Sequence, residues 1–298
     1  MYRPFILIAA ITLATPAPGW AQSSNNAGAL DTTVAFDARG TVIVTCPGGA
    51  VIVTGADRGE IRVRARTESG AIRFTSNGSR AILEPAAGRR CSDGRYEITV
   101  PTGARVSASS RSGSVEVRGV RGDVEIHTQS ADVDVRNAGA RLDVETLSGD
   151  IDVQGVASDA SISTVSGDVT LGGARGDVEI ETVSGDLQLR DVIAKQVRTR
   201  TTSGDVEFTG QILGDGRYEF NTHSGEIRLQ LPANVGAQLS VSTFSGGIDS
   251  DFPITLKAGE HGIGAAQAKR LAFTLGQGSA RIIAETFSGD ITLSSTRR

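Results

Sequence analysis

The sequence is poor in the residues on which most enzymes and metal sites depend. Of its 298 residues, two are cysteine, three are histidine and one is tryptophan, and aromatic residues make up 4%. The histidines, His127, His223 and His261, are scattered and match no spacing typical of a metal site or a catalytic triad. So few aromatic residues also leave no platform on which sugars could stack.

Strong positive charge and long apolar runs are lacking as well. The formal net charge is −4, without a basic stripe, which argues against a nucleic-acid partner. The apolar stretch from Phe5 to Leu13 is too short to span a bilayer. With Arg3 before it and Gly19-Trp20-Ala21 after it, the stretch predicts a signal peptide over residues 1–21, cleaved after Ala21. We therefore expect an exported protein, periplasmic, cell-surface or secreted, with no transmembrane segment in the mature chain.

The two cysteines, Cys46 and Cys91, predict one disulfide in an exported chain. Neither belongs to a C-x-x-C motif, and neither has a histidine nearby, so a redox or nucleophilic thiol is not supported. A metal site on the pair would need further ligands, which the sequence does not offer at suitable spacing.

What the sequence does contain is a repeat. From Asp123, an Asp recurs every nine residues at seven of eight steps, with Arg141 as the exception. The residues one and three positions after each anchor are all apolar, and most are β-branched. Such regularity predicts a repeat architecture of short strands separated by turns.

A second period of eighteen residues lies over the first. Alternate steps end in the motif T-x-S-G-D, as at Thr146–Asp150, Thr164–Asp168 and Thr182–Asp186. The expected fold class is therefore all-β, a parallel β-solenoid (β-helix) with about 18–21 residues and two main strands per coil and an irregular N-terminal cap. Phe208, Tyr218, Phe220 and Phe244 suggest a core that widens toward the C-terminus.

Coils stacked at about 4.8 Å would place Val124, Leu142, Ala160 and Val178 in one internal column. In the turns, Gly can adopt positive φ, and Asp suits an Asx-turn with the amides just beyond it. Inward Thr side chains could form a hydroxyl ladder. The predicted repeat turn residues are Gly149, Asp150, Gly167, Asp168, Gly185, Asp186, Gly204, Asp205, Gly289 and Asp290.

The expected organisation has four parts. Residues 1–21 are the signal peptide, and residues 22–33 are a flexible leader rich in Ser, Asn, Ala and Gly. Residues 34–104 are N-terminal strands and a cap that the disulfide staples. Residues 105–298 are the regular repeats, with an irregular excursion at 250–280.

The pattern resembles a known family. The signal peptide, the I-T-V-P at Ile98–Pro101, the series of T-x-S-G-[DE] turns, the L-x-L-P at Leu229–Pro232 and the closing T-F-S-G-D-I-T-L at Thr286–Leu293 carry the resemblance. They are similar to the bacterial β-strand-repeat "putative adhesin" family of unknown function. The resemblance implies an exported β-helical protein with no established catalytic activity.

We therefore expect a non-enzymatic module, adhesin-like or structural, without a cofactor, whose partner is an envelope protein or surface polymer. One alternative is a polysaccharide-active enzyme, because outward pairs such as Glu179 and Glu181 lie within the spacing of inverting glycosidases. Another is a calcium-dependent surface protein, although the G-G-x-G-x-D turns of the calcium-binding β-roll are missing.

Overall fold

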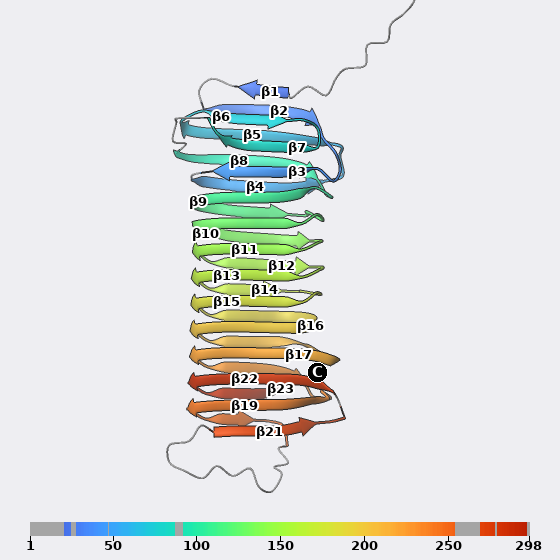
Figure 1. The fold of residues 1–298 in the computed structure, drawn as a ribbon, viewed down its shortest axis with the longest axis vertical. Coiled ribbons are helices and arrows are strands. Elements are labelled where there is room, and N and C mark those ends of the chain that lie inside the picture. Colours follow the sequence, from blue (N-terminus) through green and yellow to red (C-terminus); the bar gives the residue numbers. More distant parts are fainter. Residues whose placement is uncertain are drawn as a thin grey trace, which may run out of the picture.

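All regular structure in the described part of the chain is β-strand. The computed structural model describes residues 21–24, 28–46, 48–86, 92–253, 269–277 and 279–296. Its 23 strands belong to one sheet and lie stacked along one long axis (Figure 1). Most of the predicted signal peptide, Cys91 and residues 254–268 of the expected excursion lie outside the described residues.

The middle of the chain is the most regular part. Its strands are β9 (Arg105–Arg118), β10 (Val124–Ala138), β11 (Leu142–Ser148), β12 (Ile151–Val156), β13 (Ala160–Ser166), β14 (Val169–Gly172), β15 (Val178–Ser184) and β16 (Leu187–Ser203). Val124 pairs with Leu142, Leu142 with Ala160 and Ala160 with Val178, always in parallel. All four side chains are at most 2% exposed, so the predicted internal column is confirmed.

Alternation within each strand explains the core. Inward residues such as Val144 and Ile162 are at most 1% exposed, whereas their neighbours along the strand face outward. Burial of one Val or Ile side chain stabilises the fold by about 1.5–3 kcal/mol, and the same burial recurs in every turn of the chain.

The expected fold class, a parallel β-solenoid with two main strands per coil and an irregular cap, is wrong in that form. Strand β10 pairs with β11 through its first half and with β12 through its second. One continuous strand therefore runs around a corner and belongs to both stacks of strands. Strands β9 and β16 are similarly continuous. The chain is all-β, but its strands form one closed, barrel-like and mostly parallel layer around the core, with antiparallel strands added at both ends.

The N-terminal strands are regular, not an irregular cap. They are β1 (Ala21–Ser24), β2 (Ala29–Ala35), β3 (Thr41–Cys46), β4 (Gly49–Ala56), β5 (Glu60–Ser69), β6 (Ile72–Ser76), β7 (Arg80–Pro85) and β8 (Ser92–Pro101). Strands β3 and β4 pair in parallel with β9, and β5 pairs antiparallel with both β2 and β8. Strands β1 and β2 thus lie in the segment for which the sequence suggested a flexible leader, while the division into domains stays a prediction.

At the C-terminal end, the order of the strands in space differs from their order in the sequence. The strands are β17 (Val206–Ser224), β18 (Ile227–Pro232), β19 (Ala237–Ser245), β20 (Ile248–Ser250), β21 (Lys269–Leu275), β22 (Ala280–Ser288) and β23 (Ile291–Thr296). Strand β22 lies between β17 and β19 (Figure 1). Strand β23 pairs with both β18 and β20 and so lies between them. Strand β21 pairs antiparallel with β19 and lies beyond it.

Large aromatic side chains fill the core at this end. Phe208, Tyr218 and Phe220 are fully buried, and the Phe208 ring centroid lies 5.1 Å from that of Phe220 and 6.1 Å from that of Tyr218. The Tyr218 hydroxyl donates a hydrogen bond to the Ala194 carbonyl at 2.8 Å, and burial raises the pKa of this phenol. Phe244, expected in the same core, is 51% exposed. It follows the buried Thr243, so alternation turns its side chain outward.

Candidate interaction surface

The T-x-S-G turns form one corner of the molecule. Their glycines have positive φ at Gly149, Gly167, Gly185, Gly204, Gly225 and Gly289. At Gly185, with φ of 140°, a Cβ atom would lie 2.1 Å from the carbonyl oxygen of Gly167 in the preceding turn. The close approach of successive turns therefore requires glycine at this position.

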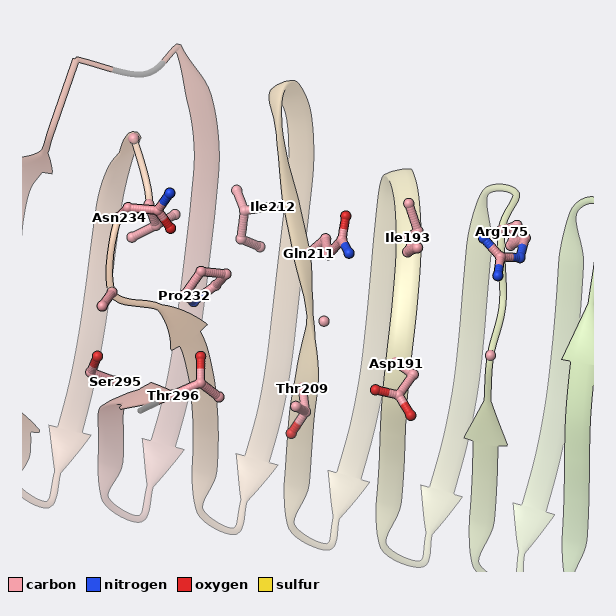
Figure 2. Close-up of a pocket in the computed structure, with 15 residues that line it drawn as sticks. Arg175, Asp191, Ile193, Thr209, Gln211, Ile212, Pro232, Asn234, Ser295 and Thr296 are labelled. Carbon is pink, nitrogen blue, oxygen red and sulfur yellow. The ribbon is translucent and has the colours of Figure 1, made fainter. Parts of the chain in front are cut away.

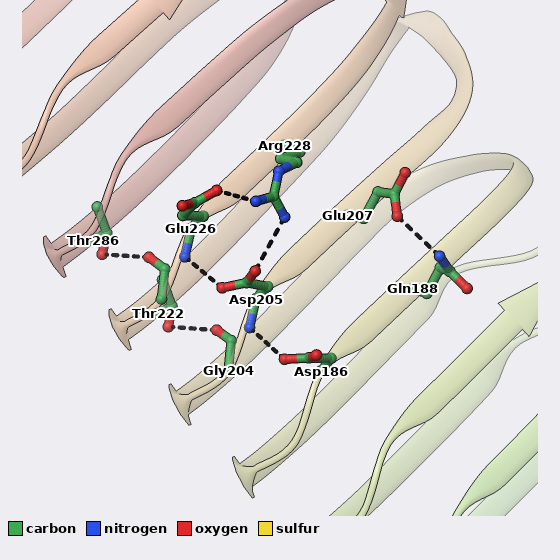
Figure 3. A network of polar contacts seen from close by, with 10 residues as sticks. Asp186, Gln188, Gly204, Asp205, Glu207, Thr222, Glu226, Arg228 and Thr286 are labelled. Carbon is green, nitrogen blue, oxygen red and sulfur yellow. Dashed lines mark hydrogen bonds and ion pairs between the residues drawn. The ribbon is translucent and has the colours of Figure 1, made fainter.

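The aspartates of these turns bond to the next turn, not within their own. The Asp168 Oδ1 accepts a hydrogen bond at 2.9 Å from the backbone amide of Asp186, and the Asp186 Oδ1 accepts one at 2.8 Å from the amide of Asp205 (Figure 3). Asp132 and Asp150 do the same with the turns that follow them. The expectation of local Asx-turns is corrected by this geometry, since each carboxylate links two turns that are about eighteen residues apart.

The threonines of the motif are buried, and most of their hydroxyls donate to carbonyl oxygens of their own or a neighbouring turn. The Thr146 hydroxyl donates to the Ser148 carbonyl at 3.1 Å, and the Thr222 hydroxyl donates to the Gly204 carbonyl at 3.2 Å (Figure 3). Thr128 does donate to the Thr146 hydroxyl at 2.6 Å. The suggested hydroxyl ladder is thus present in one step, while the other bonds described here go to carbonyl oxygens.

The residue between Thr and Ser points outward at the same corner. We call this column the ridge; in spatial order it consists of Leu147, Val165, Val183, Thr202, His223, Phe287 and Phe244. The flanking serines pair in register from turn to turn, for example Ser148 with Ser166 and Ser224 with Ser288. Within the described residues, every large apolar side chain that is exposed belongs to the ridge, with exposed fractions from 44% to 57%.

The aromatic end of the ridge is ordered by stacking. The Phe287 ring lies 4.9 Å from the His223 ring and 4.8 Å from the Phe244 ring, with interplanar angles of 10° and 6°. Because β22 is inserted between β17 and β19, Phe287 lies between two residues that precede it in the sequence. The Phe287 ring is thus stacked between the other two rings, with one of them on each of its faces.

The carboxylates suggested for sugar cleavage are bound by arginines on an open face. The Glu179 Oε1 lies 3.5 Å from the Arg198 guanidinium, and the Glu181 Oε1 lies 2.6 Å from that of Arg200. The Arg198 side chain also contacts Glu219 at 3.2 Å, and this hydrogen bond raises the pKa of Arg198. Such ion pairs leave the two glutamates engaged in cross-strand contacts, so the geometry does not favour the enzyme alternative.

His127 lies in a similar cross-strand cluster. Its Nε2 lies 2.8 Å from the Glu125 Oε1 and its Nδ1 lies 3.0 Å from the Glu145 Oε2. The hydrogen bond to Glu125, together with the charges of both carboxylates, raises the pKa of His127. The same hydrogen bond lowers the pKa of Glu125.

A groove of about 910 Å³ lies away from the ridge, at the opposite corner. Figure 2 shows that its lining side chains, among them Arg175, Asp191, Ile193 and Gln211, come from successive turns. Asp191 has φ of 53° and takes the place that Gly173 occupies one turn earlier. The described lining contains no aromatic side chain. The groove therefore lacks the stacking surface that a sugar-binding cleft uses.

Other predicted features are tested only in part. Among the described residues, no three His, Cys, Asp or Glu side chains gather as they would around a metal ion. No helix of the described chain is long and apolar enough to cross a membrane. Cys46 is buried, but the predicted disulfide partner Cys91 lies outside the described residues, so that bond stays a prediction.

The repeat pattern predicts the turn residues but does not by itself indicate the ridge. The predicted turn residues from Gly149 to Asp205, with Gly289 and Asp290, come together at one corner. The signal for the ridge was present in the middle position of T-x-S-G, which is apolar at Leu147, Val165 and Val183. When the same outward position is apolar in several successive repeats, the pattern indicates an interaction surface.

Several solved structures are similar to this chain over most of its length, at low sequence identity. The alignment with the crystal structure of a "putative adhesin" from Parabacteroides distasonis ATCC 8503 covers 91% of this chain and 98% of that protein, with 10% identity and a TM-score of 0.45. One from Bacteroides fragilis NCTC 9343 covers 93% and 98%, with 12% identity and a TM-score of 0.38. A "putative lipid binding protein" from Parabacteroides distasonis ATCC 8503 covers 91% and 98%, with 10% identity and a TM-score of 0.37.

These values transfer neither a partner nor an activity to this chain. The search of curated proteins found no match. The family model described as Toastrack DUF4097 matches residues 21–175 and 172–294, nearly all of the chain that follows the predicted signal peptide. The resemblance seen in the sequence is therefore confirmed at the level of the family, and the chain belongs to the Toastrack DUF4097 family.

Proposed function

We propose that the protein is an exported, non-enzymatic interaction module of the adhesin type, which binds an envelope protein or surface polymer through the ridge. The observation that carries the proposal is the gathering of all described exposed large apolar side chains in one column. Exposed apolar side chains scattered singly are ordinary, but a contiguous row of them marks a surface that is covered by a partner.

The geometry supports a structural scaffold for this surface. The hydrogen bonds between successive turns at Asp168 and Asp186 hold the corner, and the buried columns beneath it are closely packed. A rigid scaffold presents a binding row at little entropic cost, because the side chains of the row are already in place. The signal peptide that the sequence predicts supports a location outside the cytoplasm.

The test is binding to isolated bacterial envelope fractions, measured by co-sedimentation with the mature chain. Replacement of the two stacked phenylalanines, in F244S/F287S, should reduce bound protein at least tenfold. The matched control T202S changes a ridge residue that is already polar and should bind like the unaltered chain. Equal binding by F244S/F287S would overturn the proposal, as would turnover of envelope glycans that a single substitution such as E179Q abolishes.

A further inference from the structure

The ridge is bordered on one side by negative charge. Three residues after six of the seven ridge positions, the turn carries a carboxylate, whereas Gly247 follows Phe244. We call these carboxylates the carboxylate column: Asp150, Asp168, Asp186, Asp205, Glu226 and Asp290. The Oδ1 atoms of Asp150, Asp168 and Asp186 accept backbone amides from the next turn. Their Oδ2 atoms take no part in those bonds, and the three residues are exposed at the corner.

Positive charge is unevenly distributed along this column. Arg228 lies 3.0 Å from the Asp205 Oδ2 and also contacts Glu226 (Figure 3). In the described part of the chain, Asp150, Asp168 and Asp186 form no ion pair. Each of these three carboxylates lies one turn, or about 4.8 Å, from the next, so their combined field attracts a cation far better than one exposed carboxylate would.

The charge decides against several occupants. A second copy of this chain, placed ridge against ridge in antiparallel alignment, would bring one carboxylate column against the other, and like charges across an interface cost several kcal/mol. Nucleic acid and anionic lipid are repelled for the same reason. A sugar needs the open face of an aromatic ring, but the faces of Phe287 are covered by His223 and Phe244.

We propose that the ridge and the carboxylate column together bind a cationic amphipathic polypeptide segment of another protein. Its apolar side chains contact the ridge, and its Lys or Arg side chains face the carboxylate column. The ridge extends over six steps of about 4.8 Å, or about 29 Å, which equals the length of a helix of about 19 residues. This inference rests on the proposed function and specifies the partner's chemistry.

The experiment uses the mature chain and three synthetic 18-residue peptides labelled with a fluorophore. One is an amphipathic Leu/Lys peptide, one is its Leu/Glu counterpart, and one has Ser in place of Leu in the Leu/Lys sequence. Fluorescence anisotropy at low salt should show binding of the Leu/Lys peptide, with at least tenfold weaker binding of the other two. Raising the salt should weaken the Leu/Lys complex, because the contribution of exposed charges is screened.

Paired variants separate charge from structure. D150N/D168N removes two charges but keeps the Oδ1 acceptors for the amides of Asp168 and Asp186. The matched control D159N/D177N removes two charges whose Oδ1 atoms accept the amides of Asp177 and Gln196 at the opposite corner. We expect at least fivefold weaker Leu/Lys binding for D150N/D168N and less than twofold change for D159N/D177N.

Three results would overturn this inference: equal binding of the Leu/Glu peptide, equal losses in the two double variants, or unchanged Leu/Lys binding by F244S/F287S. Such a result leaves the proposed function standing if envelope binding still depends on F244S/F287S. If envelope binding does not depend on the ridge, the proposed function itself fails.

Discussion

Asp168 and Asp186 lie one turn apart, and the Oδ1 of the first accepts the backbone amide of the second at 2.9 Å. The same bond recurs between Asp186 and Asp205 at 2.8 Å. The aspartate of the repeat is thus a link along the long axis of the molecule. Its role explains why Asp recurs at the turns although the chain has no described metal site there.

The first prediction concerns this link. Asp168→Ala removes the acceptor for the Asp186 amide and should lower the free energy of unfolding by about 1 kcal/mol, the net value of one exposed hydrogen bond. Asp168→Asn keeps an oxygen acceptor and should retain most of the stability. Chemical denaturation of the three proteins measures the difference. Equal losses in both variants would show that the charge, and not the hydrogen bond, matters for folding.

The second prediction concerns the turn glycines. Gly185→Ala places a Cβ atom 2.1 Å from the Gly167 carbonyl oxygen in a backbone with φ of 140°. We expect a loss of more than about 2 kcal/mol in unfolding free energy, since backbone strain adds to the steric clash. Gly214→Ala is the control, because no other atom lies within 4 Å of the position that its Cβ atom would take. Comparable stability of the two variants in thermal unfolding would contradict this account.

The third prediction concerns pH. The folded state raises the pKa of His127 above its unfolded value near 6.5, so the contribution of its ion pairs is full below about pH 6.5. It is lost as the pH rises through the folded pKa. The folded state lowers the pKa of Glu125, so the contribution of Glu125 to stability has the opposite pH dependence. It is lost as the pH falls through the folded-state pKa of Glu125. His127→Gln should remove the decline in stability between neutral and weakly basic pH, which urea titrations at several pH values would reveal.

The fourth prediction concerns the inserted last turn. Strands β22 and β23 each lie between two earlier strands, so deletion of residues 279–298 leaves facing unpaired edges on β17 and β19 and on β18 and β20. We expect the truncated chain to aggregate or to lose its C-terminal strands, because exposed strand edges pair with other chains. A synthetic peptide of residues 279–296 added during refolding should restore solubility. A truncated chain that stays monomeric with the same strand content would argue against the observed strand order.

The repeat made much of the architecture predictable. Alternating apolar residues predict the inward column from Val124 to Val178, and the N-terminal strands expected within residues 34–104 are present as β3 to β8. The closed form of the sheet was not predictable, because periodicity does not say whether a strand continues around a corner, as β10 does.

Two further features could not be predicted from the sequence, for a different physical reason. The same four residues, T-F-S-G, occur at Thr243–Gly246 and at Thr286–Gly289. The local sequence is therefore equally compatible with either order of these two turns along the axis. Their spatial order depends on the connection through residues 251–279, which the repeat does not encode. Phe244 was assigned to the core on hydrophobicity alone, although its place after an inward Thr directs it outward.

The ridge as the binding surface is tested most directly by photo-crosslinking. A benzoylphenylalanine residue in place of Phe287 keeps an aromatic group in the stack, and one in place of Gln211 occupies the groove at the opposite corner. With envelope fractions under irradiation, we predict covalent adducts from position 287 and none above background from position 211. Adducts from position 211 with none from position 287 would contradict the account and assign binding to the groove.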